Sequence, residues 1–431
     1  MGRRQAELLV LLVVSALLAA ACTTTSAGER LVVDVFGPYR GDDARAFAAS
    51  VAPFEERTGI EIRFVGSGSF ARDIQDRVAD ADYPDVAIFP QPAIIREFAR
   101  DGILIPLSDV DVDEDAPRVS RTGDATPTVL GRDYGVWYRA AVKSLVWYPP
   151  TVFAERGYEI PESWEDLVAL TERIESDGLT PWCLTMESFA STGWVGTDWI
   201  EDIVLRLHGP DVYDDWVDGI VSFKSDEIME AFDIFGEVVN ERGRVLGGAH
   251  RVLNTRWQDA QIPMFEPEPK CLLHRQASFY RTHLPGSAVI GEDTDVFLLP
   301  APDGGEPPIV VSGDIAAAFT DRPEVLAFLQ FLGSPEAGTP WAKLGGFTSP
   351  HPDFDTSVYA DGFDRRMGEI IENAAVIRFD GSDSMDPAVG TGTFWTGMET
   401  FVRTADVVRT VTEIQSGYPQ PALLPTEGSA P

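Results

Sequence analysis

The feature that most constrains the fold of this chain is a regular alternation of strand-like and helix-like segments over residues 31–100. The strand-like segments are β-branched or alternate between apolar and polar residues: 31–36, 60–65 and 85–89. The helix-like segments have apolar residues at helical spacing: 42–58, 70–81 and 93–100. Strands separated by helices pair in parallel through right-handed crossovers. We therefore predict an α/β layer with a mostly parallel sheet.

The carboxyl ends of these strands indicate where a ligand would bind, because open α/β sheets bind ligands beyond those ends. Turn-rich segments follow all three predicted strands and supply hydroxyl, amide and aromatic groups: Tyr39, Ser67, Ser69 and Gln91. We predict that these groups converge on one rim of the sheet.

A chain of 431 residues is too long for one compact core and indicates two domains. Residues 134–148 form a long β-prone run with aromatic residues at both ends, which we interpret as a crossover between the domains. In the helical region that follows, Ser163 is a good N-cap with Asp166 three residues on. The other predicted elements are helices at 164–174, 198–207, 226–242 and 323–332, and strand-like runs at 271–280, 295–299 and 313–319.

The N-terminus has the pattern of an export signal. Arg3 and Arg4 precede an apolar run over 8–21, which is shorter than the roughly 20 residues that span a bilayer. Residues 18–22, Leu-Ala-Ala-Ala-Cys, resemble the lipobox of bacterial lipoproteins. That resemblance implies that 1–21 is a cleaved signal peptide, and that a lipid on Cys22 anchors the protein to the outer side of the cell membrane.

Two further cysteines, Cys183 and Cys271, form an even pair in a chain with an export signal. Such a pair favours a disulfide, and the alternative is two buried free thiols.

The charge of the chain restricts its partners. There are 69 Asp and Glu against 34 Lys and Arg, which gives a formal net charge of -35. Such a chain repels nucleic acid and anionic lipid surfaces, so we expect no nucleic-acid partner. Acids at alternate positions in 109–115 lack the Gly and Glu of a calcium loop, and we interpret them as a solvated loop.

Sequence motifs for catalysis are missing. The five histidines stand at least nine residues apart, and there is no HExxH, CxxC, GxSxG or Walker motif. We therefore predict no enzyme activity, no cofactor and no metal site. A glycosidase pair of carboxylates stays open as an alternative, because spacing alone does not exclude it.

Two clusters combine aromatic residues with small polar ones: 187–194, followed by Asp198 and Trp199, and 392–397. A pyranose has an apolar face and a ring of hydroxyls, so its site needs an aromatic plate with polar groups at the rim. Both clusters supply these groups. Packing in a core is the alternative, which we weigh evenly for Trp194 and favour for Trp199.

In the order and spacing of several short motifs, the chain resembles the extracellular solute-binding proteins of carbohydrate ABC importers, a maltose-binding-like family, nearest to the α-glucoside-type branch. The resemblance covers nearly all of the mature chain. The motifs that carry it are 53–56 with 58–60, 84–87, 142–148, Trp194 with 196–202, 313–316, 345–347 and 392–395.

This resemblance implies a type II periplasmic-binding-protein-like fold, in which two lobes, each a mostly parallel sheet flanked by helices, are joined by several crossovers. The implied boundaries are 1–21 signal peptide, 22–30 lipidated linker, 31–133 with 286–335 first lobe, 134–285 with 336–417 second lobe, and 418–431 disordered tail. Ligand-binding positions follow from the resemblance and from the clusters above: Tyr39, Ser67, Ser69, Gln91, Arg139, Glu187, Trp194, Gln276, Ser278, Asp314, Phe347 and Trp395.

The expected function is therefore capture of a sugar or oligosaccharide between the lobes and its delivery to the transmembrane subunits of an ABC permease, by a monomer. Two alternatives remain at this point. One is a lipid-anchored glycoside hydrolase, and the other is a binding protein for another solute such as a polyamine.

Overall fold

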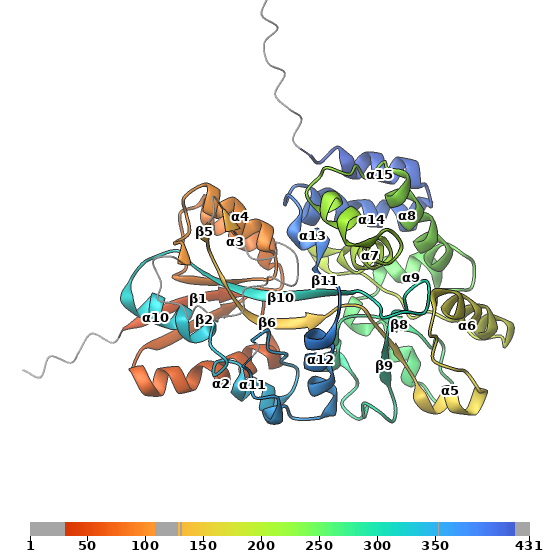
Figure 1. Ribbon diagram of the computed structural model, residues 1–431, viewed down its shortest axis with the longest axis horizontal. Helices are drawn as coiled ribbons and strands as arrows, with labels where there is room; N and C mark the ends of the chain where they lie inside the picture. Colours follow the sequence, from red (N-terminus) through yellow and green to blue (C-terminus); the bar gives the residue numbers. More distant parts are fainter. Residues whose placement is uncertain (1–30, 108–127, 130–131, 352, 419–431) are drawn as a thin grey trace, which may run out of the picture.

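The computed structural model describes residues 31–107, 128–129, 132–351 and 353–418 (Figure 1). The predicted signal peptide, the lipidated Cys22 with its linker, and the acidic loop at 109–115 lie outside these residues. The strands are β1 (Val32–Gly37), β2 (Glu61–Gly66), β3 (Val86–Phe89), β4 (Thr128–Val129), β5 (Arg132–Asp133), β6 (Val136–Val142), β7 (Leu145–Tyr148), β8 (His274–Arg275), β9 (Asp295–Leu298), β10 (Ile309–Ala318) and β11 (Ile377–Phe379).

The helices are α2 (Gly41–Thr58), α3 (Phe70–Ala79), α4 (Pro92–Arg100), α5 (Pro150–Arg156), α6 (Trp164–Ser176), α7 (Trp194–Val217), α8 (Asp226–Val239), α9 (Gly248–Asn254), α10 (Pro323–Leu332), α11 (Thr339–Leu344), α12 (Gly362–Asn373), α13 (Gly381–Ser384), α14 (Trp395–Thr404) and α15 (Val407–Gln415). Within the described ranges, none of these helices has the length and apolar character that crossing a membrane requires.

The predicted α/β layer is confirmed as a six-stranded sheet with the order β11-β10-β3-β1-β2, in which β6 also pairs with β10. Strand β1 pairs in parallel with β2 and β3, as the alternation predicts. Strand β10 returns antiparallel to both β3 and β6. The sheet is therefore parallel across β3, β1 and β2, and mixed around β10.

Side chains of β1 pack on both faces of this sheet, because successive residues of a strand point to opposite sides. Val33 and Val35 join a core with Phe47 of α2, whereas Phe36 joins a second core with Phe70 and Ile74 of α3. Helices thus cover both faces of the sheet, which explains why the strand sequences are almost continuously apolar.

The run at 134–148 crosses between the lobes, as predicted. Residues Lys143 and Ser144 divide it into β6, which belongs to the large sheet, and β7, which belongs to a separate sheet of order β8-β7-β9. Figure 1 shows β6 and β10 running side by side between the two halves of the molecule. Two antiparallel strands therefore form much of the connection.

The second lobe is mainly helical. Its small sheet pairs antiparallel, whereas the family resemblance implies a mostly parallel sheet in each lobe. Parallel pairing in this lobe consists of isolated bridges, such as those from Trp182 to Val245 and to Leu273. At the start of α6, Ser163 and Asp166 form the predicted reciprocal capping box.

The C-terminal third of the chain visits both lobes. Trp341 and Phe347, in a segment that the resemblance assigns to the second lobe, are buried in the core of the first lobe with Val33 and Tyr138. By contrast, Phe394 and residues of α14 and α15 pack in the core of the second lobe. Tyr418, the first residue of the expected tail, packs against Phe223, and residues 419–431 lie outside the description.

The cysteine pair is joined as a disulfide, Cys183–Cys271, with a sequence separation of 88. The two cysteines lie in a small apolar cluster with Met264. The carbonyl of Cys183 accepts a hydrogen bond of 2.7 Å from Nδ1 of His274 in β8. Burial lowers the pKa of His274 to about 4, so this imidazole is neutral at physiological pH.

Candidate functional site

A cleft of about 660 Å³ lies between the lobes, within the size range of small-molecule sites. Its lining comes from the loops after β1, β2 and β3, from β6 and β10, and from the starts of α7, α13 and α14. The cleft therefore lies at the carboxyl ends of the parallel strands, where α/β sheets bind ligands. Eight of the predicted positions line it: Tyr39, Ser67, Gln91, Arg139, Glu187, Trp194, Asp314 and Trp395.

The wall from the first lobe is built around a cross-strand pair of a buried arginine and a partly buried aspartate. Arg139 in β6 stands opposite Asp314 in β10, with 3.7 Å between Nη1 and Oδ2. The hydroxyl of Tyr39 donates to the same Oδ2 at 2.9 Å, and the Arg139 guanidinium lies 4.5 Å from the centroid of the Trp341 ring. Burial raises the pKa of Asp314, which the nearby guanidinium counteracts. These contacts hold the polar groups of this wall in fixed orientations.

The wall from the second lobe combines aromatic rings with one carboxylate. Trp194 meets Trp257 edge to face, with ring centroids 5.1 Å apart. Glu187 accepts a hydrogen bond of 2.9 Å from the backbone N–H of Phe189. Phe189 has a φ of 53° and 67% of its surface exposed, an unusual backbone conformation for a bulky residue. This wall thus combines the exposed ring of Phe189 with an edge-to-face pair of indole rings.

Trp395 is placed by close backbone packing. It is the first residue of α14 and follows a π-helical turn, Val389–Phe394, a feature that often accompanies functional sites. Gly193 has a φ of 113°, and a Cβ atom there would lie 2.1 Å from the carbonyl oxygen of Trp395. Only glycine fits at residue 193, because both the conformation and the contact exclude a side chain. The two aromatic clusters of the sequence therefore meet at this point.

Four predicted positions do not line the cleft. Ser69 precedes α3, and its N–H donates to the hydroxyl of Ser67 at 2.9 Å. Ser278 accepts a hydrogen bond from the N–H of Val142 at 3.2 Å, so it connects to the crossover. Gln276 is fully buried and accepts a hydrogen bond from the N–H of Ala277. Phe347 is a core residue, packed 5.4 Å from Tyr138 between ring centroids.

The floor of the cleft contains buried charges that sequence reasoning missed. The ammonium group of Lys143 donates to Oδ1 of Asp198 at 2.9 Å and to Oδ2 of Asp380. Arg275 binds the other oxygen of Asp198 at 3.0 Å and also contacts Asp202. Lys143, Asp198 and Asp380 are all buried, and all three line the cleft. Lys143 thus joins the crossover to two acidic segments at the floor of the cleft.

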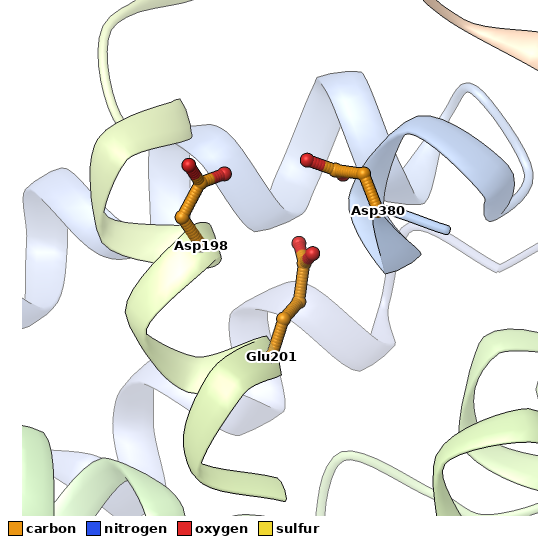
Figure 2. A group of neighbouring side chains, drawn as sticks. All are labelled: Asp198, Glu201 and Asp380. Atoms are coloured by element: carbon orange, nitrogen blue, oxygen red, sulfur yellow. The ribbon is translucent and has the colours of Figure 1, made fainter. Parts of the chain in front are cut away.

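Asp198, Glu201 and Asp380 bring their carboxylate oxygens within 4.8 Å of one another (Figure 2). Figure 2 shows Asp198 and Glu201 projecting from one helix, α7, toward Asp380 just before α13. Lys143 bonds to two of these three acids, so a protein ammonium already supplies positive charge at this position. We therefore interpret the group as part of a salt-bridge network.

Burial raises the pKa of every acid in this network, but the net shift differs in sign between them. Burial raises the pKa of Asp198 to about 6 and raises those of Glu201 and Asp383 well above the usual range, with Asp380 as the next cause for both. For Asp380, the nearby Lys143 outweighs burial and lowers the pKa. For Asp202, Arg206 and Arg275 have the same effect.

Little in the sequence signals this floor. Lys143 lies inside a β-prone run, and Asp380 and Asp383 lie 182 and 185 residues from Asp198, so no local spacing relates them. A weak signal exists, because a lysine inside an apolar, β-prone stretch of sequence needs a partner when it is buried. Phe189 of the predicted cluster at 187–194 also lines the cleft. The sequence did not predict four further lining residues: Arg256, Trp257, Phe279 and His283.

Comparison with protein families gives a match over residues 37–243 to the family model described as bacterial extracellular solute-binding protein. Among curated proteins, the osmoprotective compounds-binding protein GgtB of Synechocystis sp. is 40% identical over 396 residues, which are 91% of this chain and 93% of that protein. The alpha-glucosides-binding periplasmic protein AglE of Rhizobium meliloti is 38% identical over 378 residues, 85% of this chain and 82% of that protein.

Solved structures share the fold at low identity. The bacterial solute receptor AcbH superposes with a TM-score of 0.75 at 19% identity and covers 90% of this chain and 97% of its own. A chitin oligosaccharide binding protein gives the same TM-score at 15% identity, with 90% of this chain and 98% of that chain covered. Both support the two-lobed architecture.

Proposed function

The chain belongs to the bacterial extracellular solute-binding protein family, and from this premise we propose that it captures a sugar or oligosaccharide, of α-glucoside type, for an ABC importer. The observation that carries the proposal is the cleft between the lobes, in which the indole rings of Trp194 and Trp395 lie among carboxylate, amide and guanidinium groups. Aromatic rings suit the apolar face of a pyranose, and the polar groups suit its hydroxyls.

The proposed mechanism involves binding without chemistry. The lobes close over the sugar, and a membrane permease then recognises the closed form. Closure requires that the sugar binds the closed state more tightly than the open state. Micromolar binding would need about 8 kcal/mol from contacts in the cleft. The strands β6 and β10 pass between the lobes, and we expect them to act as the hinge that bends when the lobes close.

Lipid attachment at Cys22 is part of the proposal and rests on the lipobox pattern. It would hold the protein at the outer side of the membrane near the permease, and we expect the protein to act as a monomer. Mass spectrometry of the membrane fraction tests the anchor. A diacylglyceryl-modified Cys22 at the new N-terminus supports it, and a free chain that still contains residues 1–21 contradicts it.

Acidic residues in the cleft also raise the question of a cationic ligand. However, Asp198, Asp314 and Asp380 each have an arginine or lysine partner, which reduces the charge that a polyamine would meet. The indole N–H of Trp395 is buried without a partner among the described residues and needs an acceptor. An ammonium group cannot accept a hydrogen bond, whereas a hydroxyl can. A neutral polyhydroxyl ligand therefore fits better.

A thermal-shift screen tests the proposal. We expect stabilisation by at least one of trehalose, sucrose and maltose, and none by spermidine or by amino acids, because a ligand that binds only the folded state raises its stability. Calorimetry then gives the affinity, and chromatography of the recovered sugar checks that it is intact. Stabilisation by spermidine alone would indicate the polyamine alternative, and cleaved sugar would indicate a glycosidase.

A further inference from the structure

One carboxyl group at the floor of the cleft has no cation to balance its charge. Asp383 is 7% exposed and lines the cleft. Among the described residues, no lysine, arginine or histidine lies within ion-pair distance of it, because Lys143 bonds to Asp198 and Asp380 instead. A buried carboxylate without a cationic partner is costly, and protonation removes the charge.

Asp383 has an amide partner from the other lobe. Nε2 of Gln91, in the loop after β3, donates to Oδ1 of Asp383 at 3.1 Å. The other amide atom of Gln91, Oε1, is buried without a hydrogen-bond partner among the described residues. An unpaired buried polar atom is costly, so a ligand group that pairs with it gains affinity. The second oxygen of Asp383, Oδ2, likewise bonds to none of the described residues.

We propose that Asp383 carries a proton in the working protein and, together with Gln91, holds one hydroxyl of the bound ligand at the lobe interface. Protonated Asp383 donates to the ligand oxygen, and Oε1 of Gln91 accepts from the ligand hydroxyl. A single ligand hydroxyl would thus accept a hydrogen bond from Asp383 of one lobe and donate one to Gln91 of the other. This inference rests on the proposed function and assigns Asp383 a role in ligand specificity.

The surroundings of Asp383 favour the proton. On its own element, Asp380 accepts the backbone N–H of Asp383 at 2.9 Å. From α7, Asp198 and Glu201 face the same network, and from the crossover Lys143 is the nearest cation. On the α4 side, Arg96 bonds to the carbonyl of Ser384. Arg275 lies behind Asp198, at 3.0 Å from it. None of these cations forms an ion pair with Asp383, and burial followed by Asp380 raises its pKa well above the usual range.

If Asp383 must be protonated to bind the ligand, ligand affinity depends on pH. Ligand binding to the protonated form raises the pKa of Asp383 further, so affinity is full below that pKa and falls as pH rises through it. Loss of the proton would remove the donor and leave a negative charge against the ligand oxygen. Above the pKa of the free protein, the dissociation constant should rise about tenfold for each pH unit.

Calorimetry on the full chain from pH 6 to pH 9, with whichever of trehalose, sucrose and maltose binds, tests this. We expect wild-type affinity to fall as pH rises, by up to about tenfold for each pH unit above the pKa of Asp383. Asp383→Asn supplies a permanent donor, so its affinity should change less than about twofold. Gln91→Met should bind more weakly at every pH and keep the slope. The matched control is Asp386→Asn, an exposed acid of the same segment, which should keep the wild-type profile.

Proton uptake provides a second readout that does not depend on variant stability. Titrations at pH 8.5 in phosphate and in Tris, which differ in ionisation enthalpy, should show up to one proton taken up per ligand by the wild type and none by Asp383→Asn. Sugar binding with pH-independent affinity and no proton uptake would overturn the inference and leave the proposed function standing. If none of the three sugars binds at pH 6, the proposed function and this inference both fail.

Discussion

The ammonium of Lys143 lies 2.9 Å from Oδ1 of Asp198, which joins the crossover between the lobes to the second turn of α7. Lys143 and Asp198 are both buried, and Lys143 also bonds to Asp380 ahead of α13. One side chain therefore connects a crossover segment to two segments of the second lobe at the floor of the cleft. This geometry leads to specific expectations for stability and binding.

Lys143→Met should destabilise the protein strongly, because it leaves Asp198 and Asp380 buried with too little positive charge. Breaking one side of a buried ion pair costs about 3–5 kcal/mol. Urea denaturation at pH 7 measures the change. Lys224→Met, at an exposed lysine, is the matched control and should stay within about 0.5 kcal/mol of the wild type. Equal effects of the two variants would contradict the role of Lys143.

Stability should fall as pH rises through the range in which Asp198 ionises. Its pKa is about 6 in the folded protein against a usual value of 3.8. Because this pKa is raised, the contribution of Asp198 to the free energy of unfolding is complete below pH 3.8 and is lost as pH rises through 6. The shift corresponds to about 3 kcal/mol. Urea denaturation at pH 4, 5, 6, 7 and 8 should therefore show a slope that Asp198→Asn reduces, and an unchanged slope in that variant would refute the assignment.

Trp395→Ala should remove most of the sugar affinity, because the ring lines the cleft and is 6% exposed. We expect the dissociation constant to rise at least about tenfold, or about 1.4 kcal/mol. Calorimetry at pH 6 measures it, with thermal unfolding as a check on the fold. Trp164→Ala, at a tryptophan of α6 outside the cleft lining, should keep the wild-type affinity. Unchanged binding heats in Trp395→Ala would argue against this site.

Gly193→Ala should weaken both stability and binding, because a Cβ atom would meet the backbone of Trp395 at 2.1 Å. The control is Gly178→Ala, an exposed residue with a φ of 78° and open space around it. The control carries only the conformational cost of about 1–2 kcal/mol. The larger loss of stability, and any loss of affinity, should occur in Gly193→Ala alone. Comparable losses in both variants would show that contact with Trp395 is unimportant.

Reduction of the Cys183–Cys271 disulfide should lower the free energy of unfolding by about 4–5 kcal/mol, since it closes a loop of 88 residues in the unfolded chain. Denaturation with and without reductant measures the loss. In the double variant Cys183→Ala with Cys271→Ala, reductant should have no further effect. A wild-type protein that is insensitive to complete reduction would contradict this expectation.

Local sequence patterns predicted the elements of the first lobe well. The strand and helix ranges over 31–100 agree closely with β1 to β3 and α2 to α4, because a buried sheet with helices on both faces imposes clear periodicities. The strand ends also predicted Tyr39, Ser67 and Gln91 as cleft residues. The run at 271–280 was less accurate, since only His274–Arg275 forms a strand and Ser278–His283 forms a 3₁₀ helix.

The sequence by itself determined the α/β layer, the cysteine pair and the family, because periodicity, residue spacing and motif order are local or ordered along the chain. Tertiary structure alone decided which polar groups share the floor of the cleft. Lys143, Asp198 and Asp383 meet only because a crossover, a helix start and a late turn converge there. Whether a buried acid is paired with a cation or carries a proton depends on distances between such remote segments, and these distances are absent from the order of residues.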